Sequence, residues 1–323
     1  MSLRSEKSAE DKHKQGLSKY FEIHKPVFWP SVLLILAVIV TTLLMGDRAK
    51  VMFDTVQKVI SNNFGWLFIL SVTGFLLFSI SIAFSRFGNI RLGGKQATPE
   101  YSTKAWFAML FSAGMGIGIM FWSVAEPVYH YLSPPMAEAE TVAAARQAMS
   151  LSYLHWGFHA WGIYSIVALS LAFFAFNRGL PLSFRSVFHP LLGDRIEGWI
   201  GDIVDILAVL ATMFGLATSL GLGVQQVSAG LNHLFNMQSG IYLQVGLIAG
   251  ITAVATMSVV LGIDKGIRVL SEANIRIAVL FLLFMLIVGP TVYIFDSFVQ
   301  NTGQYLNNIF RYSFWTETYL DSN

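Results

Sequence analysis

The 323-residue sequence contains no cysteine and few charged residues. The lack of cysteine excludes disulfide frameworks and thiolate metal sites. Charged residues make up 12% of the chain, whereas about 25% is usual for a soluble domain. The net charge of +2 gives no basic excess that would attract a nucleic acid. Because 54% of the residues are hydrophobic, so few charges cannot shield them from water, and the predicted solvent is lipid.

Seven apolar stretches without charged residues are long enough to cross a bilayer as helices, which takes roughly 20 residues. Strands of a membrane β-barrel would instead alternate in polarity over about ten residues. The sequence therefore predicts an all-α polytopic membrane protein. The predicted spans are 27–46, 64–85, 105–125, 147–177, 206–228, 241–263 and 277–295.

The distribution of basic residues predicts how the chain is oriented. Of the 21 Lys and Arg residues, 16 lie in the N-terminal tail and in the connections that follow even-numbered spans. The positive-inside rule therefore predicts a cytoplasmic N-terminus, in a bacterial-type inner membrane. Residues 1–26 read as a polar cytoplasmic tail, and the first span lacks the small-residue cleavage site of a signal peptide. Residues 296–323 read as an extracytoplasmic, interfacial amphipathic segment.

The third predicted span contains three glycines at alternate positions, in the segment Ser112-Ala-Gly-Met-Gly-Ile-Gly118. Glycine costs about 1 kcal/mol relative to alanine inside a helix, so a compensating role is expected. Close helix packing between small residues is one interpretation. An unwound segment that lines a binding cavity is the other. The sequence alone leaves both open.

The fourth predicted span carries Trp156, Trp161 and Tyr164, which would share one broad face of a continuous helix. An interfacial aromatic belt is the ordinary explanation for such residues. Tyr164 lies too near the predicted centre of the span for that explanation. An aromatic face beside bare glycine backbone would suit a quaternary ammonium group, which is held by cation–π contact.

The polar residues near the predicted spans favour structural roles. Glu126 is expected to be a hydrated acid at a helix end, and His155 and His159 are expected to be packing histidines without a metal. Asp202 and Asp205 are expected to favour the dipole at a helix N-terminus. No nucleotide-binding loop, nucleophile elbow or zinc-binding histidine pair is present, and no enzymatic activity or cofactor is predicted.

Two classes of function remain, a solute transporter and a seven-helix receptor or photoprotein. A retinal Schiff base needs a lysine within the membrane, and none of the predicted spans contains one. A receptor of the animal type would place its N-terminus outside, against the charge distribution. The transporter class is therefore favoured.

The motifs resemble those of the betaine/choline/carnitine transporters over roughly residues 25–312. They occur in the family's order: the glycine stretch 114–118, Met120-Phe-Trp-Ser-Val-Ala-Glu-Pro127, the segment 155–164, Phe214-Gly-Leu-Ala-Thr-Ser-Leu-Gly-Leu-Gly223, Gly262-Ile-Asp-Lys-Gly-Ile-Arg and Val288-Gly-Pro-Thr291. The resemblance implies a twelve-span, leucine-transporter-type fold with two inverted repeats. Residues 27–85 would then form two peripheral helices, and residues 105–295 the first repeat. It also implies a homotrimer, and a second repeat beyond residue 323, so that this chain would be an N-terminal portion.

The same resemblance implies a substrate site and a sodium site. Half of an aromatic box would come from Trp156, Trp161 and Tyr164, beside the flexible stretch Gly114, Met115, Gly116, Ile117 and Gly118. Sodium as the coupling ion would lie near Ser112, Ala113, Met115 and Thr212. A second hydroxyl that sodium-coupled members carry four residues after the first is replaced by Leu216. Because choline-preferring members often carry an acid at the position of Gly118, glycine betaine is the expected substrate, with choline, carnitine or another methylated compound as alternatives.

Overall fold

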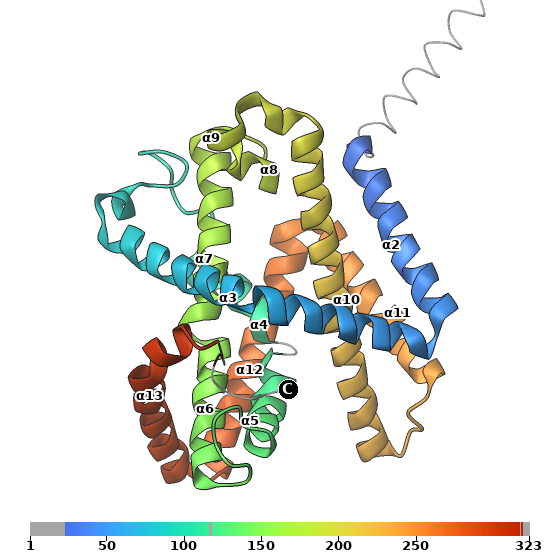
Figure 1. Ribbon diagram of the computed structural model, residues 1–323, viewed down its shortest axis with the longest axis vertical. Helices are drawn as coiled ribbons and strands as arrows, with labels where there is room; N and C mark the ends of the chain where they lie inside the picture. The colour runs from blue at the N-terminus through green and yellow to red at the C-terminus, as the bar shows by residue number, and fades with distance from the viewer. Residues whose placement is uncertain (1–22, 116–117, 317, 319–323) are drawn as a thin grey trace, which may run out of the picture.

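The computed structural model describes residues 23–115, 118–316 and 318, and the described residues form helices and turns without a strand. Figure 1 shows the helices and their labels. The α-helices are α2 (Lys25–Met45), α3 (Asp47–Phe84), α4 (Thr103–Met115), α5 (Ser123–Leu132), α6 (Val142–Trp156), α7 (Phe158–Ala172), α8 (Phe184–Val187), α9 (His189–Leu192), α10 (Trp199–Phe235), α11 (Ile241–Val260), α12 (Arg268–Val288) and α13 (Thr291–Ser313). Short 3-10 segments span Arg86–Asn89 and Gly193–Glu197, and π-helical turns span Gly118–Trp122, Phe173–Asn177 and Ile263–Ile267.

Among the described residues, six helical stretches are long and apolar enough to cross a membrane. They confirm the predicted all-α polytopic class. The third predicted span, 105–125, is not among them, because it falls on α4 and α5 on either side of residues 116–117. With 13 and 10 residues, these two helices are each shorter than the roughly 20 residues that a single span needs.

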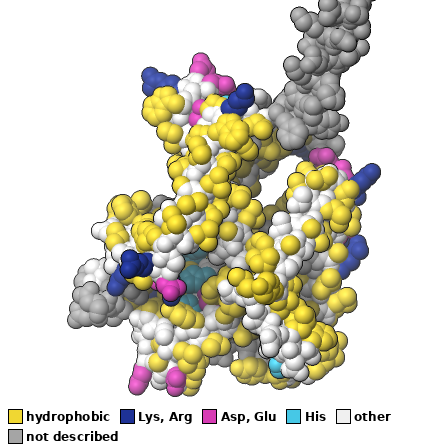
Figure 2. Space-filling view, turned by 90° about the vertical axis from the view of Figure 1, so that its right-hand side faces the viewer, with side chains coloured by type: hydrophobic (Ala, Val, Ile, Leu, Met, Phe, Trp, Pro, Cys, Tyr) yellow, Lys and Arg dark blue, Asp and Glu magenta, His cyan; other side chains and the backbone are white. Residues whose placement is uncertain are grey.

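The apolar side chains of these helices point outward. Leu43 and Leu44 are 76% and 83% exposed, and hydrophobic side chains are spread over the face shown in Figure 2. The buried positions are instead dominated by small residues, such as Ala105, Ala144 and Ser150. Small residues let helix backbones approach closely, which is how helices associate when lipid replaces water around them.

The helices pack in pairs that bring distant parts of the chain together. α3 lies against α7, α4 against α12, and α6 against both α5 and α13. α2 joins α3 at Gly46, whose φ of 53° is a conformation that glycine adopts readily, and α2 packs on α10. In Figure 1, α3 runs across the picture, whereas α7 and α10 run from top to bottom. Nothing in this packing tests the division into a peripheral pair and a repeat, which stays a prediction.

Several predicted boundaries differ from the observed ones; the fifth predicted span, 206–228, for example, lies within the longer helix α10 (Trp199–Phe235). α3 begins at Asp47 rather than near residue 64, because polar residues 47–63 continue the helix. The seventh predicted span ends at Gly289–Pro290, where α13 begins, so the C-terminal helix starts before residue 296. The amphipathic helix itself is present, and it buries Tyr305 and Tyr312 within the protein. Residues 1–22 of the predicted tail lie outside the described residues.

Candidate functional site

A cavity of about 480 Å³ lies among α4, the π-helical turn Gly118–Trp122, α5, α6 and α7. Its lining is rich in aromatic and small residues, and none of the described lining residues is charged. A site without a charged side chain suits an apolar or net-neutral ligand better than an ion. The lining residues are Phe111, Gly114, Gly118, Ser123, Pro127, Met149, Ser152, Tyr153, Trp156, Gly157 and Trp161.

The glycines of the third predicted span differ in what surrounds them. A β-carbon at position 118 would lie 2.5 Å from Cζ3 of Trp156, so only glycine lets the indole pack there undisturbed. A β-carbon at position 114 would meet nothing within 4 Å. Since Gly114 lines the cavity without a described neighbour pressing on it, close packing does not account for this glycine.

The fourth predicted span is not one continuous helix. α6 ends at Trp156 and α7 begins at Phe158, with Gly157 between them at φ −96° and ψ −141°. A β-carbon on Gly157 would overlap the carbonyl oxygen of Tyr153 and lie 2.9 Å from the hydroxyl of Tyr305. That hydroxyl accepts a hydrogen bond from the amide of Phe158 at 3.2 Å. The break is therefore stabilised by a residue of α13.

This break changes the predicted aromatic face. Trp156 and Trp161 both line the cavity, but they belong to different helices, so the angular argument for one continuous helix is wrong. Tyr164 is 57% exposed and does not line the cavity, although its ring centroid lies 5.6 Å from that of Trp161.

Two aromatic residues of the lining, Phe111 and Tyr153, were not predicted. The ring of Phe111 lies 4.7 Å from that of Trp161 and 4.1 Å from that of Phe107, between centroids. Phe111 precedes Gly114 by three residues, a spacing that places both on one face of α4. That spacing could have identified Phe111 from the sequence.

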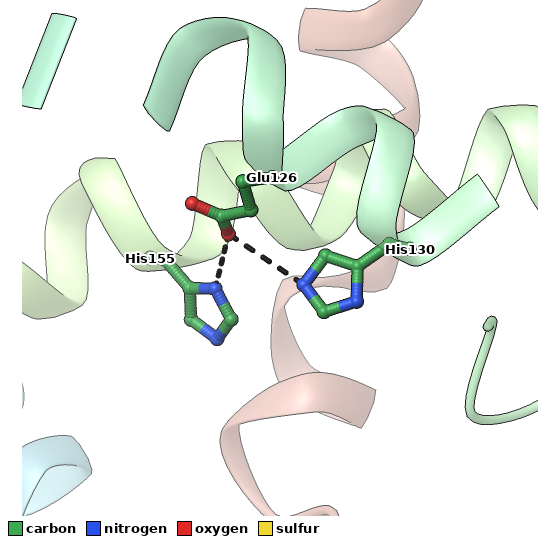
Figure 3. Close-up of side chains that lie close together, drawn as sticks. All are labelled: Glu126, His130 and His155. Carbon is green, nitrogen blue, oxygen red and sulfur yellow. Dashed lines mark hydrogen bonds and ion pairs between the residues drawn. The ribbon is translucent and has the colours of Figure 1, made fainter. Parts of the chain in front are cut away.

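Glu126 is buried beside the cavity, and the prediction that it is a hydrated acid at a helix end is wrong. It is 6% exposed, and its Oε2 accepts a hydrogen bond from the indole Nε1 of Trp156 at 2.7 Å. Its Oε1 is hydrogen-bonded to Nδ1 of His155 and lies 3.7 Å from Nε2 of His130. Figure 3 shows both imidazoles turned toward this carboxylate. Glu126 thus links α5 to α6 at the residue that covers Gly118.

The two histidines of the fourth predicted span differ in surroundings. His159 is buried, and its Nε2 lies 2.8 Å from the hydroxyl of Ser313, which confirms its packing role. The side chain of His155 is 53% exposed and pairs with Glu126, so it is not a packing histidine. Its acidic partner comes from a neighbouring helix, which the span's own sequence could not reveal.

The predicted sodium residues do not form one described cluster. The amide nitrogen of Asn274, on α12, donates to the Ser112 hydroxyl at 3.1 Å. The Thr212 hydroxyl donates to the carbonyl of Ala208 within α10 at 2.8 Å. Gly116 and Ile117, and the side chains of Ala113 and Met115, lie outside the described residues.

A second polar cluster joins α8 to the start of α10. Arg185 donates through Nε to Asp205 at 2.6 Å, through Nη2 to Asp202 at 2.8 Å, and through Nη1 to the Ile196 carbonyl at 3.3 Å. Nε2 of His24 lies 2.8 Å from the same Asp202 oxygen. The two aspartates do lie near the helix N-terminus as predicted. Their charges, however, are paired with Arg185, and that of Asp202 also with His24, so the helix dipole is not their main partner.

Comparison with known proteins gives one family. The model of the betaine/carnitine/choline family transporters matches residues 26–323. The chain is 45% identical over 297 residues to a glycine betaine transporter of Acinetobacter baylyi, covering 92% of this chain and 45% of that protein. It is 50% identical over 274 residues to glycine betaine transporter 1 of Vibrio parahaemolyticus, covering 83% and 52%.

A third relative, the glycine betaine transporter OpuD of Bacillus subtilis, is 43% identical over 289 residues, covering 89% of this chain and 56% of that protein. The chain spans about half the length of the curated relatives it matches. The family match extends over the glycine stretch, the tryptophan pair and the cavity that they line. The chain belongs to the betaine/carnitine/choline family of transporters.

Proposed function

We propose that the protein imports a quaternary-ammonium osmolyte, with glycine betaine as the substrate, by sodium-coupled alternating access. The observation that carries this proposal is the uncharged cavity lined by Trp156 and Trp161. A trimethylammonium group has no hydrogen to donate, so it is held by aromatic faces, each worth up to about 2 kcal/mol when desolvated. The three relatives named above carry the name glycine betaine transporter, which supports the same substrate.

The glycine at position 118 favours a zwitterion over a simple cation. Choline carries a net positive charge, which an acidic side chain would stabilise, whereas glycine betaine carries its own carboxylate. At position 118 any side chain would displace the Trp156 ring. Choline and carnitine are the alternative substrates, and a relative from Acinetobacter baylyi, 42% identical, is named as an osmo-dependent choline transporter.

The orientation, coupling ion and assembly belong to the same proposal. The excess of Lys and Arg after even-numbered spans supports a cytoplasmic N-terminus in the inner membrane of a bacterium. Sodium would bind near Ser112, whose hydroxyl already has Asn274 as a polar neighbour. A homotrimer is implied by the family resemblance, and light scattering of the purified protein in detergent would measure it.

Uptake of radiolabelled glycine betaine tests the site and the coupling ion. Trp161→Leu removes one aromatic face of the cavity, so we expect KM to rise about tenfold, equivalent to roughly 1.4 kcal/mol of lost binding. Trp199→Leu, which alters a tryptophan 71% exposed at the start of α10, serves as the matched control. Uptake should stop when potassium replaces sodium in the buffer.

Two results would contradict the proposal. An unchanged KM in Trp161→Leu would contradict the aromatic substrate site. Undiminished uptake in potassium buffer would contradict sodium coupling. Competition by unlabelled choline and carnitine ranks the alternatives, since the preferred substrate should displace the label at the lowest concentration.

A further inference from the structure

One turn after Glu126 on α5, the largely buried His130 lacks a described hydrogen-bond partner at Nδ1. Its side chain is 15% exposed, and no described residue forms a hydrogen bond with its Nδ1. Its Nε2 points toward Oε1 of Glu126 but stands 3.7 Å away, too far for a hydrogen bond. Most buried polar atoms in proteins are satisfied, so the unpartnered Nδ1 is unusual, and the 3.7 Å gap at Nε2 is a second feature of the same ring.

The gap has the size that a bound metal ion requires. In a tetrahedral zinc site with bonds of about 2.0–2.2 Å to nitrogen and oxygen, neighbouring ligand atoms lie about 3.3 Å apart. Glu126 Oε1 and His130 Nε2 are already close to that separation. One ligand atom from each of Glu126, His130 and His155 lies within 4.8 Å of the other two. Because Nδ1 of His155 is hydrogen-bonded to Oε1 of Glu126, these two atoms must move apart to admit an ion.

The three ligands are positioned by two helices. Glu126 and His130 are four residues apart on α5, so they project from the same face of that helix. His155 comes from the last turn of α6, which packs directly on α5. A metal ion held by these ligands would therefore cross-link α5 to α6.

The surroundings of the cluster suit an exchangeable metal. The Trp156 indole already holds Oε2 of Glu126 at 2.7 Å, which leaves Oε1 directed at the histidines. Such hydrogen bonds to a ligating carboxylate orient it and strengthen metal binding. The side chain of His155 is 53% exposed, so the described residues do not enclose the site completely. Three protein ligands leave a fourth position for water.

We propose that Glu126, His130 and His155 form a binding site for a divalent transition metal, Zn²⁺ above all, and that the bound ion inhibits transport. Two imidazoles and one carboxylate form a ligand set that zinc commonly takes. On binding, the ion takes the place of the hydrogen on Nδ1 of His155: a neutral imidazole then carries its proton on Nε2, whereas an imidazolium releases one proton to solvent.

The inhibitory effect follows from what the ligands touch. Pro127 lies next to Glu126 and lines the cavity, and Trp156 lies next to His155 and lines it too. Fixing α5 to α6 would hold the Trp156 ring over Gly118 and resist any change of the cavity during transport. This regulatory step depends on the proposed transport function, whereas the metal site itself does not.

Zinc binding to the purified, tag-free protein in detergent tests the site directly. Competition with a chromophoric chelator should give one Zn²⁺ per chain for the unaltered protein. His130→Gln and His155→Gln should each weaken binding more than about tenfold, because even changes to the residues that support zinc ligands cost about 10–100-fold. His233→Gln, a histidine of α10 outside the cluster, is the matched control and should bind zinc normally.

Cobalt as a probe separates loss of a ligand from loss of folding. Co²⁺ in this site should give the visible absorption of a four-coordinate nitrogen and oxygen environment. That spectrum should disappear in His130→Gln while the circular dichroism of its helices stays unchanged. The site is overturned if the unaltered protein binds no zinc, or if all the variants bind zinc as the unaltered protein does.

Transport then tests the regulatory step. Micromolar external Zn²⁺ should inhibit glycine betaine uptake by the unaltered protein, and His130→Gln should transport without that inhibition. If zinc binds with the expected dependence on His130 but uptake is unaffected, the inhibitory role is wrong. If no glycine betaine is taken up at all, the proposed transport function fails, while the zinc-binding experiment still decides the metal site.

Discussion

The two polar clusters of the protein differ in how completely their charges are paired. At the start of α10, one guanidinium lies between two carboxylates, Asp202 and Asp205, and its remaining nitrogen donates to the backbone of Ile196. Between α5 and α6, one carboxylate lies between two imidazoles, and the Nδ1 of His130 has no described partner. We call the cluster around Arg185 closed, because each nitrogen of its guanidinium has a partner. We call the cluster around Glu126 open, because one imidazole nitrogen has no described partner.

This difference indicates a structural role for the cluster around Arg185 and a binding role for the cluster around Glu126. Arg185 offers a rigid set of donors that matches carboxylates closely, and each of its three nitrogens has an acceptor. Such a cluster has little capacity left for a ligand, and it fixes α8 to α10. The cluster around Glu126 keeps a free nitrogen, an exposed histidine and an unfilled gap. The comparison predicts a graded set of effects on stability.

Removing the shared cation of the closed cluster should have the largest effect. Arg185→Met leaves two poorly exposed aspartates without their main partner, so we expect a loss of about 3 kcal/mol in the free energy of unfolding. Thermal unfolding in detergent, followed by circular dichroism, measures it. Arg276→Met breaks a pair whose arginine side chain is 73% exposed, and it should cost less than about 1 kcal/mol.

The reason for this loss can be checked by removing the aspartates as well. Adding Asp202→Asn and Asp205→Asn to Arg185→Met removes the unpaired charges, and much of the lost stability should return. A triple variant that is no more stable than Arg185→Met would mean that packing of the arginine stem, rather than its charge, holds α8 to α10.

Removing the charge of the open cluster should have a smaller effect on stability. Glu126→Gln keeps an oxygen that can accept from the Trp156 indole, and the side chain of His155 is half exposed rather than enclosed by the protein. We expect a loss of about 1 kcal/mol, typical of one hydrogen bond, in the same unfolding measurement. Glu272→Gln, at an acid of α12 paired with Arg276, is the matched control. A loss as large as that of Arg185→Met would show that the two clusters do not differ in kind.

The fold class followed from the sequence, whereas breaks within spans did not. Charge-free runs of helix length are a strong signal, because the bilayer sets how many apolar residues a span needs. The division at Gly157 depends on the Tyr305 hydroxyl, which comes from a helix almost 150 residues later. No local pattern reports a contact of that kind, so the chain read as one long span between residues 147 and 177.

The candidate site was predicted only in part. Four of the predicted residues do line one cavity, namely Gly114, Gly118, Trp156 and Trp161. They could be predicted because glycine and tryptophan stand out in an apolar run. The pairing of Glu126 with His155 was missed, since it joins two helices across a loop. The pairing of Arg185 with Asp202 was missed for the same reason. From the sequence alone, a charged residue near the end of a span is interpreted as hydrated, because its partner on another helix is not apparent.

The smallest effect is expected at His24, and it tests how closed the cluster around Arg185 is. The His24 side chain is 57% exposed, and its partner Asp202 is also held by Arg185. His24→Ala alone should therefore cost less than about 0.5 kcal/mol in the same unfolding measurement. In the Arg185→Met background, His24 is left as the described ion-pair partner of Asp202. Removing His24 there should therefore lower the free energy of unfolding by more than it does in the unaltered protein. Equal costs in the two backgrounds would mean that Arg185 and His24 stabilise Asp202 independently.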